Sequence, residues 1–223
     1  MPRIARIVAE GYPHHVTQRG NNRTAVFLDD DDRCKYLDLL ADYAGRYNLQ
    51  IWAHCLMDDH LHLLAVPPSG TALSRGIGLT NQVYTQYFNR KYGSSGRVWQ
   101  NRFFSCAVDA HHYLWAVVRY IINNPVKAGR VKRAEEYPWS SAAALLLGGH
   151  EVRFASSEWL KAEEREGFRA FAKESNSYID NAIRKATSNG RPFGSEGFVR
   201  LLEERLRMRI RANPVGRPRI HKQ

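Results

Sequence analysis

The pattern of apolar and polar positions predicts a chain of short strands and amphipathic helices. Runs rich in apolar residues, with the length of strands and bounded by turn residues, occur at residues 12–17, 51–57, 60–66 and 98–108. Apolar residues recur every three or four positions, as on one face of a helix, over residues 29–47, 71–92 and 110–124. Polar, glycine-rich or proline-rich residues separate these segments and predict turns.

Two histidines stand two residues apart in the third strand-like run. Side chains at this spacing share one face of a strand, so His60 and His62 point the same way while Leu61 points into a core. Asp58 and Asp59 precede them and predict the tight turn of a hairpin. Two neighbouring neutral imidazoles can hold a divalent cation. For an isolated pair, ordinary half-buried strand histidines are the alternative.

The helix predicted at residues 110–124 presents a tyrosine beside an amide. Tyr120 falls on one flank of its apolar stripe, and Asn124 lies one turn further on, so both polar groups face the same neighbour. Pro125 ends this helix, because the residue before a proline disfavours helical geometry. Tyr113, one heptad earlier on nearly the same flank, is the alternative tyrosine.

The residue composition of the chain changes after this helix. Residues 137–141 are predicted to pack back on the preceding elements, and a charged, helical stretch with few apolar anchors follows over residues 150–188. Another amphipathic helix is predicted over residues 196–208. We therefore divide the chain into a first domain, residues 1–145, and a helical, basic extension, residues 146–223.

The charge of the chain points to a polyanionic partner. The sequence has 33 Lys and Arg residues against 22 Asp and Glu residues, a net charge of +11. Nucleic acid is the expected partner, and an anionic membrane surface is the competing one. No stretch approaches the roughly 18 apolar residues of a membrane span, and the N-terminal residues lack a signal-peptide core, so we expect a cytoplasmic protein. Its 3 cysteines form no C-x-x-C motif and predict neither disulfides nor a zinc knuckle.

Three kinds of chemistry use a pair of histidines spaced in this way. A metal-dependent hydrolase on a β/α barrel needs roughly 250 residues for the barrel, more than the 223 present. A two-histidine phosphodiesterase needs two H-x-T or H-x-S motifs, and only residues 15–17 qualify. In the third, a DNA-nicking enzyme, a histidine-bound metal polarises a scissile phosphate and a tyrosine hydroxyl attacks it. The helix at residues 110–124 can supply that tyrosine.

Four blocks of sequence resemble the REP-associated tyrosine transposases, relatives of the single-tyrosine insertion-sequence transposases in the HUH nuclease superfamily. The blocks are HVTQRGNN at residues 15–22, LMDDHLHLL at 56–64, WQNRF at 99–103 and RYIINNPVKAG at 119–129. The resemblance covers about residues 1–145. It implies an α+β fold of the HUH, ferredoxin-like or RRM-like type, with an antiparallel sheet and helices packed on it.

The same resemblance implies a site and a substrate. It assigns Tyr120 as nucleophile and His60, His62 and Asn124 as ligands of a metal, which we expect to be Mg²⁺ or Mn²⁺. The implied activity is nicking and rejoining of single-stranded DNA hairpins, of the kind made by repetitive extragenic palindromes, through a covalent 5′-phosphotyrosine. Family members commonly have Pro-Asn where this chain has Asp58-Asp59, a departure that leaves the two histidines intact.

The remaining expectations concern DNA contacts and assembly. The arginines expected to contact DNA lie in loops and in the C-terminal tail: Arg19, Arg23, Arg97, Arg102, Arg217 and Arg219. The last two belong to a Gly-Arg-Pro-Arg sequence that resembles minor-groove hooks, and a solvated basic tail is the alternative. A catalytically silent nucleic-acid binder, such as a repressor or an RRM-like module, is the alternative function, although no RNP1-like string is present. Both a monomer and a homodimer are compatible with the sequence.

Overall fold

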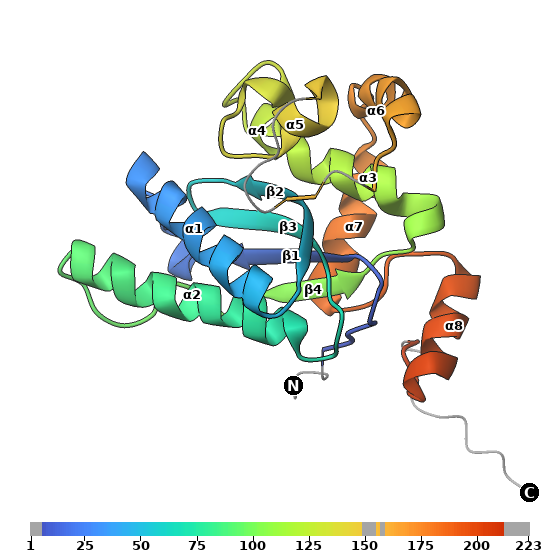
Figure 1. Ribbon diagram of the computed structural model, residues 1–223, viewed down its shortest axis with the longest axis horizontal. Helices are drawn as coiled ribbons and strands as arrows, with labels where there is room; N and C mark the ends of the chain where they lie inside the picture. The colour runs from blue at the N-terminus through green and yellow to red at the C-terminus, as the bar shows by residue number, and fades with distance from the viewer. Residues whose placement is uncertain (1–5, 149–154, 157–158, 212–223) are drawn as a thin grey trace, which may run out of the picture.

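The computed structural model of the protein describes residues 6–148, 155–156 and 159–211. A four-stranded antiparallel sheet in the order β2-β3-β1-β4 lies at its centre. The strands are β1 (His14–Arg19), β2 (Gln50–Leu56), β3 (His60–Val66) and β4 (Phe104–Ala107). Helices cover both faces of this sheet (Figure 1). The predicted α+β class, an antiparallel sheet with helices packed on it, is confirmed.

Strands β2 and β3 form the predicted hairpin, with Asp58 and Asp59 at its turn. Strand β3 also pairs with β1 along its whole length. Because side chains alternate along a strand, His60 and His62 share one face of the sheet and Leu61 lies on the other, where it is fully buried.

Helices α1 (Asp30–Arg46) and α2 (Ala72–Lys91) cover the face that carries Leu61. Helix α1 begins after Asp29, whose carboxylate accepts a hydrogen bond from the backbone N–H of Asp32 and caps the helix. Trp99 and Phe103 belong to the same core and are only 8% and 6% exposed. These two aromatic rings are therefore core residues rather than platforms on which bases stack.

Helices α3 (Ala110–Ile122), α5 (Ala142–Leu147), α6 (Arg165–Ala172) and α7 (Ser177–Asn189) lie on the opposite face. One apolar core joins Leu64 of β3 to Val118 of α3, and it continues to Phe168 of α6 and Ile183 of α7. Packing is thus continuous across residue 145. The division into residues 1–145 and 146–223 stays a prediction, and α6 and α7 are part of the core that covers the histidine face.

Helix α8 (Glu196–Leu206) packs at the end of the molecule beside the N-terminal segment. Phe198 and Leu202 of α8 share a small core with Ile7 and Ala9. The helix predicted over residues 196–208 is present and ends at Leu206. None of the described helices is both long enough and apolar enough to cross a lipid bilayer.

Two predicted elements differ in extent. The strand predicted over residues 98–108 is regular only in β4, because Trp99 turns into the core and makes an isolated bridge with Gly20. The helix predicted to end before Pro125 ends at Ile122, and a separate turn, α4 (Asn124–Lys127), follows it. Proline is tolerated there because the first turn of a helix does not use its N–H groups. Short 3₁₀ helices complete the chain: η1 (Asn21–Arg23), η2 (Ala134–Glu136) and η3 (Ala162–Glu164).

His14 connects the N-terminal segment to β1 and makes the fold sensitive to acid. Its side chain is fully buried, Nδ1 donates to the Tyr12 carbonyl at 2.8 Å, and Nε2 accepts from the Ala9 N–H at 3.1 Å. Burial lowers the pKa of His14 from 6.5 to about 4; nearby Arg6 lowers it further, and the Tyr12 carbonyl opposes the shift. Protonation would place a second N–H against the Ala9 N–H.

We expect His14 to contribute stability that is lost in acid. Its pKa is lower in the folded than in the unfolded protein, so its contribution is complete above pH 6.5 and is lost as the pH falls toward about 4. The total loss is about 3 kcal/mol, since each pKa unit corresponds to about 1.4 kcal/mol. Urea unfolding of the wild type and of His14→Gln between pH 7 and pH 4.5 measures this. The variant should lose less stability per pH unit, and parallel curves would contradict the assignment.

Candidate functional site

His60 and His62 lie side by side on β3. Their ring centroids are 5.1 Å apart and their planes are nearly perpendicular, at 87°. The side chain of His60 is 20% exposed at the rim, whereas His62 is buried. The two imidazoles are therefore adjacent, with His60 partly exposed and His62 buried.

Asp59 fixes the orientation of His60. One of its carboxylate oxygens lies 2.5 Å from Nδ1 of His60, so Nδ1 carries a proton and donates a hydrogen bond to the carboxylate. In the neutral imidazole the lone pair is then on Nε2. A carboxylate behind an imidazole is the common partner of a metal-binding histidine, because it fixes the tautomer and the ring orientation.

A buried chain of hydrogen bonds holds His62 from the other side. Nδ1 of His62 lies 3.0 Å from Nε2 of His15, and Nδ1 of His15 lies 2.7 Å from Oγ1 of Thr187 on α7. The Thr187 hydroxyl donates to the Ile183 carbonyl at 2.9 Å. Thr187 therefore accepts from His15, and His15 accepts from His62. This direction leaves the lone pair of His62 on Nε2.

Burial keeps these two imidazoles neutral. It lowers the pKa of His15 to about 3. Burial also holds the pKa of His62 well below its ordinary value, and neighbouring His15, His60, Arg19 and Lys127 act in the same direction. Metal ions bind neutral imidazole. His62 is therefore in the ligand form throughout the neutral pH range.

Tyr120 of α3 contacts both buried imidazoles. Its ring centroid lies 5.5 Å from that of His15 and 5.4 Å from that of His62, and its plane is nearly perpendicular to both. Tyr120 is only 5% exposed. Lys127 stands over its ring, with Nζ 5.0 Å from the centroid, and donates to Asp180 of α7 at 2.6 Å. The sheet, α3 and α7 thus converge on one tyrosine.

Asn124 follows one turn after Tyr120. Its Nδ2 donates to the carbonyl oxygens of Tyr120 and Ile121, at 2.7 and 3.3 Å, and satisfies acceptors at the end of α3. Within the described residues, its Oδ1 accepts no hydrogen bond, and no hydrogen bond joins Asn124 to His60 or His62. Tyr120 therefore contacts His62 of the pair directly, whereas in the described part of the chain Asn124 bonds only to carbonyl oxygens of α3.

The donor atoms are of types that can bind a divalent cation. Two imidazole nitrogens and an amide oxygen are ligands that ions such as Mg²⁺ and Mn²⁺ accept, with positions left for phosphate oxygens and water. The described part of the chain has no group of three or more His, Cys, Asp and Glu side chains that could hold a metal. A metal here would need the amide oxygen, or oxygens of the DNA, to complete its coordination.

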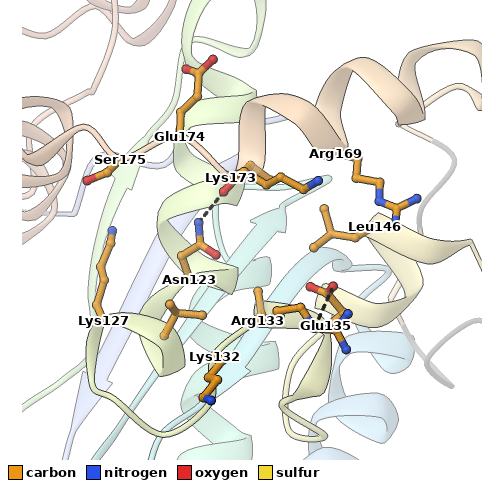
Figure 2. A pocket seen from close by; sticks show the side chains of 13 residues that line it. Asn123, Lys127, Lys132, Arg133, Glu135, Leu146, Arg169, Lys173, Glu174 and Ser175 are labelled. Carbon is orange, nitrogen blue, oxygen red and sulfur yellow. Dashed lines mark hydrogen bonds and ion pairs between the residues drawn. The ribbon is translucent and has the colours of Figure 1, made fainter.

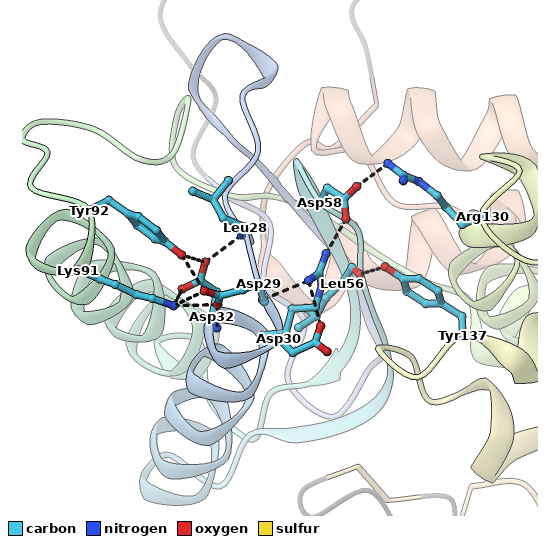
Figure 3. A network of polar contacts seen from close by, with 11 residues as sticks. Leu28, Asp29, Asp30, Asp32, Leu56, Asp58, Lys91, Tyr92, Arg130 and Tyr137 are labelled. Atoms are coloured by element: carbon cyan, nitrogen blue, oxygen red, sulfur yellow. Dashed lines mark hydrogen bonds and ion pairs between the residues drawn. The ribbon is translucent and has the colours of Figure 1, made fainter.

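Several elements hold the turn before His60. The Asp58 carboxylate pairs with Arg33 of α1 and with Arg130, which follows α4. Figure 3 shows Arg130 pointing toward Asp58. The carbonyl oxygens of Asp58 and Asp59 also accept hydrogen bonds from three backbone N–H groups, those of Gly20, Val26 and Phe27. The Asp58-Asp59 sequence, which departs from the family pattern, therefore has two tasks: its first residue fixes the turn and its second orients His60.

The arginines expected to contact DNA occupy different places. Arg19 is exposed at the end of β1 and lies opposite His60 in the strand pairing. Arg23 is exposed at the end of η1, and Arg97 and Arg102 line a shallow cavity of about 450 Å³. Arg217 and Arg219 lie outside the described residues. Arg19 is thus the one arginine of this group that the described structure places beside the histidines.

Four residues that support the site were not predicted from the sequence. His15, Thr187, Lys127 and Asp180 were not among the predicted site residues. His15 and Lys127 lie within the matching blocks, so the resemblance contained a signal for them. Thr187 and Asp180 lie in the charged stretch beyond those blocks, where no motif indicated them.

The alternative tyrosine is held elsewhere. Tyr113 packs against Phe193, with ring centroids 4.8 Å apart. In the described residues it makes no ring contact with His60 or His62. The geometry therefore favours Tyr120 over Tyr113.

Comparisons with known proteins agree with this geometry. The family model described as "Transposase IS200 like" matches residues 9–124, the part that contains the whole sheet and α3. A REP-associated tyrosine transposase of Haemophilus influenzae is 26% identical over 148 residues, which cover 58% of this chain and 84% of that protein. A solved structure of a REP-associated tyrosine transposase bound to a REP hairpin is 20% identical and has a TM-score of 0.55. That match covers 72% of this chain and 94% of the other, and it bears on the fold.

The family match covers more than half of the chain, and it includes both histidines, Tyr120 and Asn124. The resemblance to the REP-associated tyrosine transposases is therefore confirmed. This chain belongs to the IS200-like family of tyrosine transposases.

Proposed function

We propose that this transposase is a metal-dependent endonuclease and strand transferase that nicks and rejoins single-stranded hairpin DNA through a covalent 5′-phosphotyrosine. The observation that carries this proposal is the contact between Tyr120 and the neutral, hydrogen-bonded imidazole of His62. A potential nucleophile and a potential metal ligand thus come from two different elements and meet in one place.

Tyr120 would supply the attacking oxygen. Its hydroxyl loses a proton to solvent as the oxygen bonds to phosphorus, and the 3′ oxygen of the cleaved strand leaves and takes up a proton. The products are a 5′-phosphotyrosine ester and a free 3′ hydroxyl. Because the ester conserves the energy of the phosphodiester bond, another 3′ hydroxyl can reverse the step and join a new strand.

His60, His62 and Asn124 would hold the Mg²⁺ or Mn²⁺ ion. When bound, such a cation withdraws charge from a non-bridging phosphate oxygen and so favours attack. Asp59 and His15 each accept a hydrogen bond from the Nδ1–H of one histidine, and they thereby keep both Nε2 lone pairs available. The chain's own residues thus fix the tautomers that a metal site requires.

Two cations border the position that a phosphate would occupy. Lys127 stands over the Tyr120 ring and is oriented by Asp180. Arg19 projects from the end of β1 opposite His60. Both are placed to offset the negative charge of a phosphate that approaches Tyr120.

Hairpin-bearing single strands are the substrate that we propose. Tyr120 is 5% exposed and fixed on a helix, so the phosphate must come to the tyrosine, and a strand free to bend does this more readily than a paired duplex. The net charge of +11 favours a nucleic acid. The similar solved structure is of a transposase bound to a REP hairpin, which supports the same class of DNA for this chain.

Tyr120→Phe tests whether Tyr120 is the nucleophile. Tyr120→Phe removes the attacking oxygen and keeps the ring that packs on His15 and His62, so the protein should fold and bind hairpin DNA with an affinity close to that of the wild type. It should form no denaturant-resistant adduct with labelled single-stranded DNA on gels. Tyr113→Phe is the matched control and should form the adduct normally. Adduct formation by Tyr120→Phe together with its loss in Tyr113→Phe would refute the assignment.

Asn124→Ala tests whether Asn124 is the third ligand of the metal ion. Asn124→Ala removes an amide oxygen, so the affinity for Mn²⁺, measured by calorimetry, should fall by about tenfold, which corresponds to about 1.4 kcal/mol. Metal-free hairpin binding should stay unchanged. Asn181→Ala, at an exposed position on α7, is the control. Equal Mn²⁺ affinity in the wild type and in Asn124→Ala would show that Asn124 is not a ligand.

Thr187→Val tests whether the hydrogen bonds from α7 through His15 orient His62. Thr187→Val keeps the shape of the side chain but removes the oxygen that accepts from His15. We expect it to weaken Mn²⁺ binding by about tenfold, at the low end of the effects seen for residues that orient metal ligands. Thr187→Ser should restore it. If Thr187→Val lowers only the free energy of unfolding and leaves Mn²⁺ affinity intact, the hydrogen-bond chain has no role in metal binding.

A further inference from the structure

A pocket of about 420 Å³ lies next to the end of α3, the helix that carries Tyr120 (Figure 2). It is formed by the end of α3 and by α4, by the segment around η2, by α5 and by the end of α6. Figure 2 shows Arg169 and Lys173 on one side of it and Lys132 and Arg133 on the other. Of its lining residues, only Lys127 also has a role in the chemistry proposed above.

Cations dominate the rim of this pocket. Five of its lining residues are basic and two are acidic: Lys127, Lys132, Arg133, Arg169 and Lys173 against Glu135 and Glu174. Lys127 is paired with Asp180, and Arg133 with Glu136. In the described part of the chain, Lys132, Arg169 and Lys173 have no carboxylate partner. Three positive charges therefore remain available to an anionic ligand.

The inner surface of the pocket is apolar. Val126, Ala134, Leu146 and Ala172 line it, and the last three are only 5–6% exposed. A cavity of this volume is at the lower end of the range for small-ligand sites, roughly 300–1,000 Å³.

The pocket adjoins the proposed nucleophile. Lys127 lines it and also stands 5.0 Å from the ring centroid of Tyr120. Asn123, another lining residue, precedes Asn124 directly in the chain and donates to the Ala172 carbonyl at 2.7 Å, which fixes the wall between α3 and α6. Lys127 therefore joins the pocket to the position of the proposed nucleophile.

We propose that this pocket binds one unpaired nucleotide of the DNA strand next to the scissile phosphate. The backbone phosphate contacts Lys132, Arg169 and Lys173, and the base lies against the apolar surface of Val126 and Leu146. A nucleotide matches both features, because it carries a negative charge on one side and a flat, weakly polar ring on the other. An acidic peptide matches only the charge. This inference rests on the proposed function, which places a DNA strand at Tyr120.

Binding of two DNAs to charge-neutralised variants tests the proposal. Fluorescence anisotropy in EDTA, which prevents metal-dependent cleavage, compares a hairpin with single-stranded flanks and the same hairpin without them. The double variant K132Q/K173Q should bind the flanked hairpin about tenfold more weakly and the unflanked hairpin as the wild type does. Its log-log salt slope with the flanked hairpin should be smaller by about 1.4, since each lost contact to a single strand removes about 0.7. Lys35→Gln, at an exposed position on α1 across the sheet, should change neither value.

Abasic sites test the part of the proposal that concerns the base. An abasic substitution moved along the flank should weaken wild-type binding at one position and have little effect elsewhere. Equal losses for flanked and unflanked hairpins in K132Q/K173Q would overturn the proposal, because the lysines would then act through general attraction. Unchanged binding of both DNAs would overturn it as well and would leave an acidic protein partner as the occupant.

Adduct formation separates this inference from the proposed function. If the wild type forms the adduct while K132Q/K173Q binds flanked DNA normally, the pocket assignment fails and the proposed chemistry stands. If the flank-specific loss is seen but no adduct forms with any hairpin, the chain binds DNA at this pocket without the proposed chemistry.

Discussion

The site depends on the burial of two imidazoles between the sheet and its helices. A buried polar group costs several kcal/mol unless it is hydrogen-bonded. The chain from His62 through His15 and Thr187 to the Ile183 carbonyl gives each of its protons an acceptor. It does so only when α7 packs over β1 and β4. One constraint, the need to hydrogen-bond these two buried imidazoles, therefore accounts for the position of α7. The same constraint accounts for the tautomer of His62 and for the neutral state of both rings. Tyr120 fills the space beside the two rings.

The rim of the site is fixed independently of this buried chain. His60 is oriented by Asp59, and the turn that carries Asp59 is held by Arg33 and Arg130 through Asp58. These contacts connect α1 on one face of the sheet with the segment after α4 on the other (Figure 3). The two candidate metal ligands are thus supported separately. His60 is oriented by the partly exposed carboxylate of Asp59, and His62 is oriented by the buried, neutral imidazole of His15. Changes in the hairpin turn and changes in α7 should affect the same centre by different routes.

Local periodicity and the matching blocks predicted much of this arrangement. Because His60 and His62 are two residues apart in a strand, they were predicted to share one face. The helical repeat of residues 110–124 predicted that Tyr120 lies on the flank of α3. What sequence could not predict is long-range: Thr187 lies 172 residues from His15 in the chain, and no periodic pattern encodes such a pairing. The extent of β4 was also overestimated, because an aromatic run such as Trp99 to Phe104 is typical of a strand and of a core-filling loop alike. The packing of α6 and α7 into the core of the histidine face could not be predicted from the sequence either, because the apolar residues of this stretch are few and far apart.

Peptide mapping of the covalent product tests the central claim, the meeting of Tyr120 and the histidine pair in one DNA-nicking centre. The wild-type protein is incubated with a single-stranded hairpin and Mn²⁺, denatured and digested with trypsin and nuclease, and its modified peptides are identified by mass spectrometry. The proposal predicts a nucleotide joined through its 5′ phosphate to the peptide that contains Tyr120. A nucleotide on another tyrosine, or cleaved DNA with a free 5′ phosphate and no modified peptide, would contradict it.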